Sequence, residues 1–134
     1  MRTARGHPAV RPAVIAFVRW LRTQYEFPIR VPVYLLARAQ VLTCEGHRVS
    51  ASFFAPYDRT VEPYIRIATG EFPRLAKEWG RRDAIVSHLI SCVHEVTHYR
   101  QWVETGDTWE AGVAVRAQTI VHRYLAQRSR RGKT

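Results

Sequence analysis

Residues 90–102, I-S-C-V-H-E-V-T-H-Y-R-Q-W, hold two histidines four positions apart, with a glutamate directly after the first. On an α-helix this spacing places His94 and His98 on one face, about one turn apart. Two imidazole nitrogens can then bind one metal ion, and Glu95 lies beside that ion, where a base for a metal-bound water belongs. The segment therefore predicts a helix that carries a metal site.

The other residues of this helix indicate that it has two different faces. An apolar stripe with alternating four- and three-residue steps lies almost opposite the histidines and consists of Ile85, Leu89, Cys92, Val96, Tyr99 and Val103. The histidine face carries Ser87 and Ser91 on the preceding turns, which leaves room for a cleft. We therefore expect Cys92 in the core and not among the ligands.

A catalytic zinc usually has three protein ligands, so a third is needed downstream. Glu104 would point about 120° away from the face of His98, and Asp107 falls in the connecting turn, where it would act as an N-cap. Glu110 is the preferred ligand, because the sequence predicts a reversal at Gly106 and Glu110 in the first turn of the next helix.

Two alternatives to a Glu110 ligand stay open at this point. The segment D-T-W-E, which starts at Asp107, has the form of a capping box, in which Glu110 would only reach back to the Asp107 backbone. His122, twelve residues after Glu110, is the rival third ligand. If His122 binds the ion, the connection must fold differently and Glu110 is a cap.

The size and composition of the chain favour one domain that spans residues 1–134, with a flexible basic tail at 128–134. No apolar run reaches the roughly 18 residues of a membrane span. The basic segment 8–24 lacks a cleavage site and is interrupted by arginines, so we expect an amphipathic helix and a cytoplasmic location. Cys44 and Cys92 form no C-x-x-C pair, and we expect both to be reduced.

The formal net charge of +10 favours anionic partners such as nucleic acid, acidic proteins or a membrane surface. The arginines, however, are spread along the chain, and only residues 128–133 form a cluster. A generally basic surface is therefore the favoured interpretation, with a dedicated nucleic-acid site as the less favoured one. The sequence indicates no membrane partner and no particular oligomeric state.

Periodicity and turn residues predict an α+β fold. The expected order is a helix over 8–25, strands over 31–43, 48–55 and 61–68, a short helix or ordered loop over 72–80, and helices over about 82–104 and 108–128. Residues 44–47 are expected to form a hairpin turn, and the sheet is expected to be three-stranded and mainly antiparallel. Pro63 inside the third strand argues for an edge position.

The segment from about Ile90 to Gln118 resembles the gluzincin branch of zinc metallopeptidases. H-E-x-x-H-Y-x-Q-W, a short turn and W-E-A-G carry the resemblance, and the small size and element order are most similar to the minigluzincins. The resemblance implies a zincin-like fold, Zn²⁺ held by His94, His98 and Glu110, and Glu95 as general base and acid in the hydrolysis of a peptide or protein substrate.

The resemblance also implies that an extended substrate pairs with the main chain of an edge strand. In this sequence that strand is Tyr64 to Ala68, so Tyr64, Ile65, Arg66 and Ile67 are the expected substrate-binding residues. Larger gluzincins often have an acidic residue four positions after the ligand glutamate, where this chain has Ala114. Support for the histidines must therefore come from elsewhere, for instance from a backbone carbonyl.

No motif assigns a residue that stabilises an oxyanion. Tyr64, Tyr99, His88 and Arg116 are candidates, although Tyr99 and His88 are better interpreted as structural. Two other functions remain open. One is a DNA-associated zincin similar to SprT-like proteins, which have a third histidine, and the other is a zincin scaffold that binds zinc but no longer cleaves.

Overall fold

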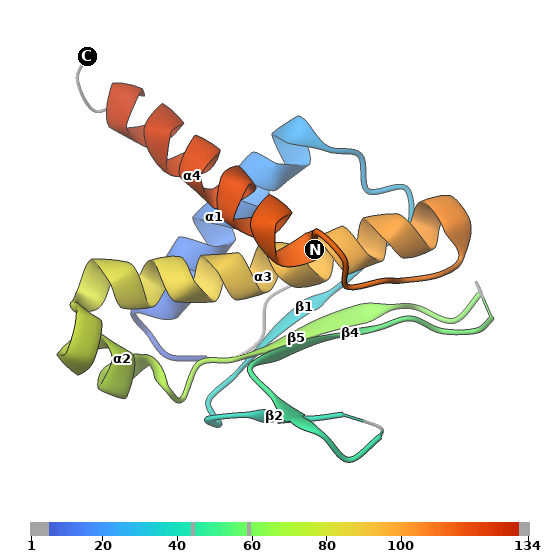
Figure 1. The fold of residues 1–134 in the computed structure, drawn as a ribbon, viewed down its shortest axis with the longest axis horizontal. Helices are drawn as coiled ribbons and strands as arrows, with labels where there is room; N and C mark the ends of the chain where they lie inside the picture. Colours follow the sequence, from blue (N-terminus) through green and yellow to red (C-terminus); the bar gives the residue numbers. More distant parts are fainter. Residues whose placement is uncertain (1–5, 44, 59, 132–134) are drawn as a thin grey trace.

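The computed structural model describes residues 6–43, 45–58 and 60–131, and its fold is α+β, as predicted (Figure 1). The elements in chain order are α1 Val10–Gln24, β1 Val33–Leu36, β2 Val41–Leu42, β3 Arg48–Val49, β4 Ala51–Phe54, β5 Tyr64–Ala68, α2 Phe72–Trp79, α3 Arg81–Thr105 and α4 Val113–Arg131. The predicted turn residue Cys44 and residues 132–134 of the expected tail lie outside the described residues, whereas residues 128–131 belong to α4.

The main sheet has three strands in the order β1-β5-β4, and β2 pairs with β3 in a separate two-stranded sheet. β1 is parallel to β5, and β4 is antiparallel to β5. The predicted mainly antiparallel sheet is therefore a mixed one. Figure 1 shows α3 with α1 and α4 on one side of this sheet and the β2–β3 hairpin on the other.

The long strand predicted for residues 31–43 is divided into β1 and β2. The Gly70 amide donates a hydrogen bond of 2.8 Å to the Arg38 carbonyl, and a Cβ on Gly70 would lie 2.5 Å from the Arg38 carbonyl carbon. The backbone of Gly70 thus packs directly against the bend at residues 37–40, which separates the two strands. The strand predicted for 48–55 is likewise interrupted, at Ser50.

The prediction of an edge position for residues 61–68 is wrong. β5 begins at Tyr64, so Pro63 precedes the strand and removes no hydrogen bond from its interior. β5 pairs on one side with β1 and on the other with β4, which makes it the central strand. The edge next to the helices belongs to β4.

The amphipathic helix predicted near the N-terminus is α1, whose buried residues include Val10, Val14, Phe17, Val18 and Leu21. The predicted end of α3 is also confirmed, because Gly106 follows the helix in a left-handed conformation with φ 80°. Among the described residues, no helix is both long enough and apolar enough to cross a bilayer.

α3 is buried on both of its faces, whereas a helix with one apolar stripe would be buried on one. Cys92, Val96 and Tyr99 of the stripe are fully or almost fully buried, while Ile85 and Val103 are half-buried. Glu95 and His98, on the other side, are buried as well. The helix therefore runs through the centre of the molecule and presents polar groups in a largely dry environment.

Candidate metal centre

The two histidines of the motif lie on the same side of α3, as their spacing predicts. The centroids of the His94 and His98 rings are 5.1 Å apart. The His94 side chain is 27% exposed and that of His98 is 8% exposed, so one ring lies at the surface and the other beneath it.

Glu110 completes the group from the segment that connects α3 to α4. Its Oε1 lies 2.8 Å from His98 Nε2, and its Oε2 lies 3.2 Å from His94 Nε2. α4 begins at Val113 and not near Thr108, so Glu110 precedes the helix instead of lying in its first turn. The capping-box interpretation is therefore wrong: the Glu110 carboxylate faces the histidines.

The nitrogen and oxygen atoms that could bind an ion lie within 4.8 Å of one another in His94, His98 and Glu110. In a tetrahedral zinc site with bonds near 2.0–2.1 Å, neighbouring ligand atoms are about 3.3 Å apart. The observed 2.8 Å and 3.2 Å contacts need only small side-chain movements to reach that spacing. Two imidazoles and one carboxylate also leave a fourth position for water, as catalytic zinc sites require. The group could hold a metal ion, and imidazole nitrogens with a carboxylate oxygen are donors that zinc accepts.

Other proposed ligands are not part of this group. His122 lies on α4 with an exposed side chain, and Glu104 is exposed near Arg100, 3.9 Å away. Asp107 caps no helix; its Oδ1 accepts a hydrogen bond from the Thr108 amide.

Gln101 forms a hydrogen bond with His98, a contact that was not predicted from the sequence. His98 Nδ1 lies 3.0 Å from Gln101 Oε1, and the Trp109 amide donates to the same oxygen at 3.0 Å. Because an amide oxygen only accepts, His98 Nδ1 carries the proton and Nε2 keeps its lone pair for a metal. The available signal was the H98-Y-R-Q101 spacing, which puts both residues on one helix face.

Glu95 lies beside the group in a buried position. Burial raises its pKa to about 7, and the Glu110 carboxylate acts in the same direction. His98 and a hydrogen bond from the Phe53 backbone amide oppose this rise. This carboxyl group can therefore exchange a proton near neutral pH, as a general base and acid must.

The expected substrate-binding residues Tyr64, Ile65, Arg66 and Ile67 need a correction. They form most of β5, whose main chain already pairs with β1 and with β4, so β5 cannot take a further strand. The edge strands of this sheet are β1 and β4, and β4 is the one that packs against α3. The Ala68 amide donates to the Ser50 carbonyl, so alternation of the ladder directs the main-chain groups of Ala51 and Phe53 away from β5.

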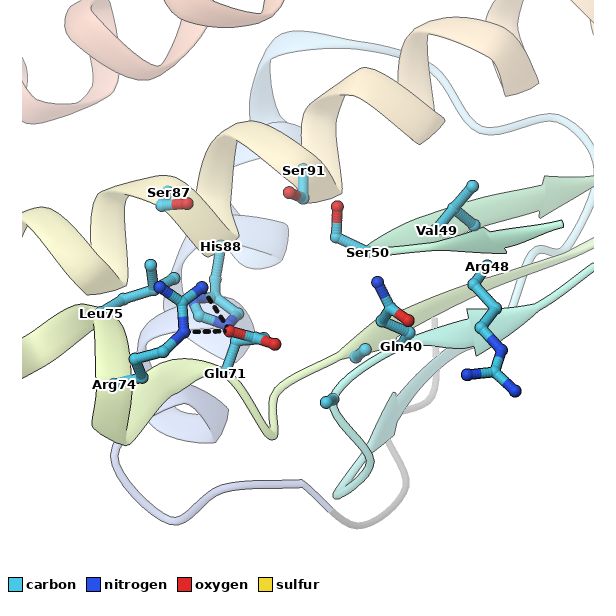
Figure 2. Close-up of a pocket in the computed structure, with 12 residues that line it drawn as sticks. Gln40, Arg48, Val49, Ser50, Glu71, Arg74, Leu75, Ser87, His88 and Ser91 are labelled. Atoms are coloured by element: carbon cyan, nitrogen blue, oxygen red, sulfur yellow. Dashed lines mark hydrogen bonds and ion pairs between the residues drawn. The ribbon is translucent and has the colours of Figure 1, made fainter.

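A cleft of about 450 Å³ runs along the N-terminal half of α3 and ends one turn before His94. Figure 2 shows Ser87 and Ser91 on α3, Ser50 opposite them, and the ion pair of Glu71 and Arg74 at one end. The two serines of α3 thus border a cleft, as predicted.

The two candidates interpreted as structural have internal partners. The Tyr99 hydroxyl donates to the Ile29 carbonyl, and the Ile29 amide donates back to it at 3.1 Å. His88 is 5% exposed and its Nδ1 lies 2.8 Å from the Ala84 carbonyl. Tyr64 stacks on Phe54, with ring centroids 4.9 Å apart. Arg116 is exposed in the first turns of α4.

The resemblance to gluzincins has no counterpart among the comparisons with known proteins. No family model, no curated protein and no solved structure matches the chain.

Proposed function

We propose that this protein is a zinc-dependent metallopeptidase that uses Glu95 as its general base. The observation that carries the proposal is the position of the Glu110 carboxylate, within 2.8 Å and 3.2 Å of the two histidine Nε2 atoms, next to the buried Glu95. A structural pair of histidines would need neither a converging carboxylate nor a buried carboxyl group beside it.

A zinc ion held by His94, His98 and Glu110 would supply a Lewis acid that acidifies water and polarises a carbonyl group. The protein's own residues do the rest. Glu95 accepts a proton from the attacking water on a carboxylate oxygen and passes it to the nitrogen of the leaving amine. Gln101 keeps the His98 ring in the required tautomer and orientation.

The edge of β4 is the best place for an extended substrate. The outward main-chain groups of Ala51 can pair with a peptide, as in other cases of strand addition. The Phe53 amide is directed toward Glu95, so the same strand also positions the base. A peptide along this edge would bring its side chains to the cleft lined by Ser50, Ser87 and Ser91.

The Glu95→Gln variant tests the proposal. The purified protein is loaded with one equivalent of zinc and incubated with unfolded casein, and cleavage is followed by the release of new amino groups. The parent should cleave. Glu95→Gln should retain zinc by elemental analysis but lose at least about a hundredfold in rate, since general acid–base catalysis contributes about 10²–10⁴.

Equal rates for the parent and the variant would rule out Glu95 as the base. A parent protein that binds zinc stoichiometrically but cleaves neither casein nor a peptide library would instead identify a zincin scaffold without peptidase activity.

A further inference from the structure

The charges of this protein are separated by element, a pattern that the linear sequence obscures. Helices α1 and α4 contain eight arginines and no aspartate or glutamate. All eleven acidic residues of the chain lie between Glu26 and Glu110. The net positive charge is therefore concentrated on two helices that are far apart in sequence.

The packing of α1 against α4 brings these arginines together. The Trp20 and Tyr124 ring centroids are 5.1 Å apart, and Trp20 Nε1 donates to Gln127 Oε1 at 3.0 Å. We use the term basic surface for the exposed residues Arg19, Arg81, Arg82, Arg123 and Arg128.

Two grooves that share Ala16 and Arg128 connect four of the five residues of the basic surface, all except Arg123. One groove, of about 730 Å³, lies among α1, the start of α3 and α4, and Arg81, Arg82 and Arg128 line it. The other, of about 350 Å³, is lined by Arg19 and Arg128. Within the described part of the chain, no aspartate or glutamate lines either groove.

Aromatic residues hold two of these guanidinium groups in place. Arg123 lies 5.8 Å from the centroid of the Trp20 ring and donates to the Tyr25 hydroxyl at 2.6 Å. Arg128 lies 5.5 Å from the Tyr124 centroid. Every arginine in an ion pair among the described residues lies between Arg30 and Arg100, outside α1 and α4. The basic surface thus offers oriented donors whose charge is not neutralised, an arrangement that suits phosphate.

The surroundings decide which polyanion fits. A helix that lies in a membrane interface presents large apolar side chains outward, but Val115 is the one exposed large hydrophobic residue on the described parts of α1 and α4. A single strand needs exposed rings for base stacking, but Trp20 and Tyr124 are only 9% and 3% exposed. We propose that the basic surface binds the phosphate backbone of a nucleic-acid duplex. This function goes beyond the proposed peptidase activity and does not depend on it.

Fluorescence anisotropy with a labelled 20-base-pair DNA duplex of arbitrary sequence tests this assignment. The parent should bind, with an affinity that falls steeply as salt increases. The triple variant Arg82→Gln, Arg123→Gln, Arg128→Gln should bind about tenfold or more weakly at 0.1 M salt. Each phosphate that this variant no longer neutralises should reduce the slope of log Kd against log salt concentration by about 0.9.

A matched triple variant, Arg30→Gln, Arg38→Gln, Arg48→Gln, removes the same charge outside the basic surface and should retain most of the affinity. Thermal unfolding and zinc content of both variants check that they are folded. Equal losses of affinity in the two variants would mean that binding depends on the net charge and not on the basic surface, and would overturn the proposal. Tighter binding to a 20-nucleotide single strand, or to vesicles rich in phosphatidylserine, than to the duplex would overturn it as well. None of these results depends on cleavage of casein.

Discussion

Gln101 Oε1 accepts two hydrogen bonds, one from His98 Nδ1 and one from the Trp109 amide. The first bond orients a ligand on α3, and the second holds the residue next to Glu110. One side chain therefore positions two of the three candidate ligands, although they come from a helix and from a connecting segment.

The Gln101→Ala variant should bind zinc about 10–100-fold more weakly, because the loss of such supporting hydrogen bonds typically has this effect. Competition with a chromophoric chelator measures the change in affinity. Gln118→Ala, at an exposed position of α4, is the matched control and should keep the parent affinity. If Gln101→Ala binds zinc as tightly as the parent, the hydrogen bond to His98 does not support the ligand.

Cys92 should be unreactive in the folded protein. Burial raises the pKa of its thiol to about 12, and the charge of Glu95 acts in the same direction. At pH 8 the reactive thiolate is then on the order of one part in ten thousand in the folded state, against about a quarter at an unperturbed pKa. Reactivity should rise with pH only toward the raised pKa.

A Cys44→Ser background leaves Cys92 as the single thiol. Iodoacetamide should leave this protein unlabelled at pH 8 and label it fully in urea, as followed by mass spectrometry. Rapid labelling of the folded protein would mean that Cys92 lies at the surface.

At the scale of elements, the sequence predicted what depends on local periodicity. The stripe and Gly106 identified α3 and its end, and the histidine spacing identified the face that carries the candidate ligands. The start of α4 could not be predicted, because Trp109 and Glu110 are held by contacts with α3 that delay the helix. The strand order could not be predicted for the same reason, because it depends on pairing between residues far apart in the sequence. Pro63 indicates only where β5 begins.

Two proline variants test whether the outer edge of β4 is free. Ala51→Pro removes an amide that points away from β5, so the ladder should stay intact and the thermal midpoint should change little. Ser52→Pro removes an amide from the side that pairs with Arg66 and should destabilise the protein by about 1–3 kcal/mol, since a backbone group loses its partner.

Urea unfolding measures both proline variants. The reverse order, with Ala51→Pro the more damaging substitution, would mean that the outward face of β4 is already occupied and that no peptide can pair there.

At the scale of the whole molecule, α3 is the axis on which the two proposed functions are arranged. Its middle carries the histidines and contacts β4, and the cleft lies along its N-terminal half. The basic surface gathers where α1 and α4 lie beside the start of α3. The sequence did not indicate this separation, because α1 and α4 lie at opposite ends of the chain and come together only on folding.

Zinc should stabilise the fold, because the proposed ligands join α3 to the segment that leads into α4. At free zinc a thousandfold above Kd, the gain is about 4 kcal/mol, which corresponds to an increase in thermal midpoint on the order of 10 °C for a domain of this size. Differential scanning fluorimetry with and without zinc measures the increase. Glu110→Ala should lose most of it, whereas His122→Ala should keep it; the opposite result would make His122 the third ligand.

The position of Glu110 has a consequence for the folding of the chain. His98 and Glu110 are twelve residues apart, with the chain reversal at Gly106 between them. An ion held by both would act as a reversible cross-link and restrict the unfolded chain much as a disulfide does, which for a 15-residue loop amounts to about 3 kcal/mol. A chelator would then remove one cross-link between α3 and the segment before α4 and leave the packing of α3 against the sheet unchanged.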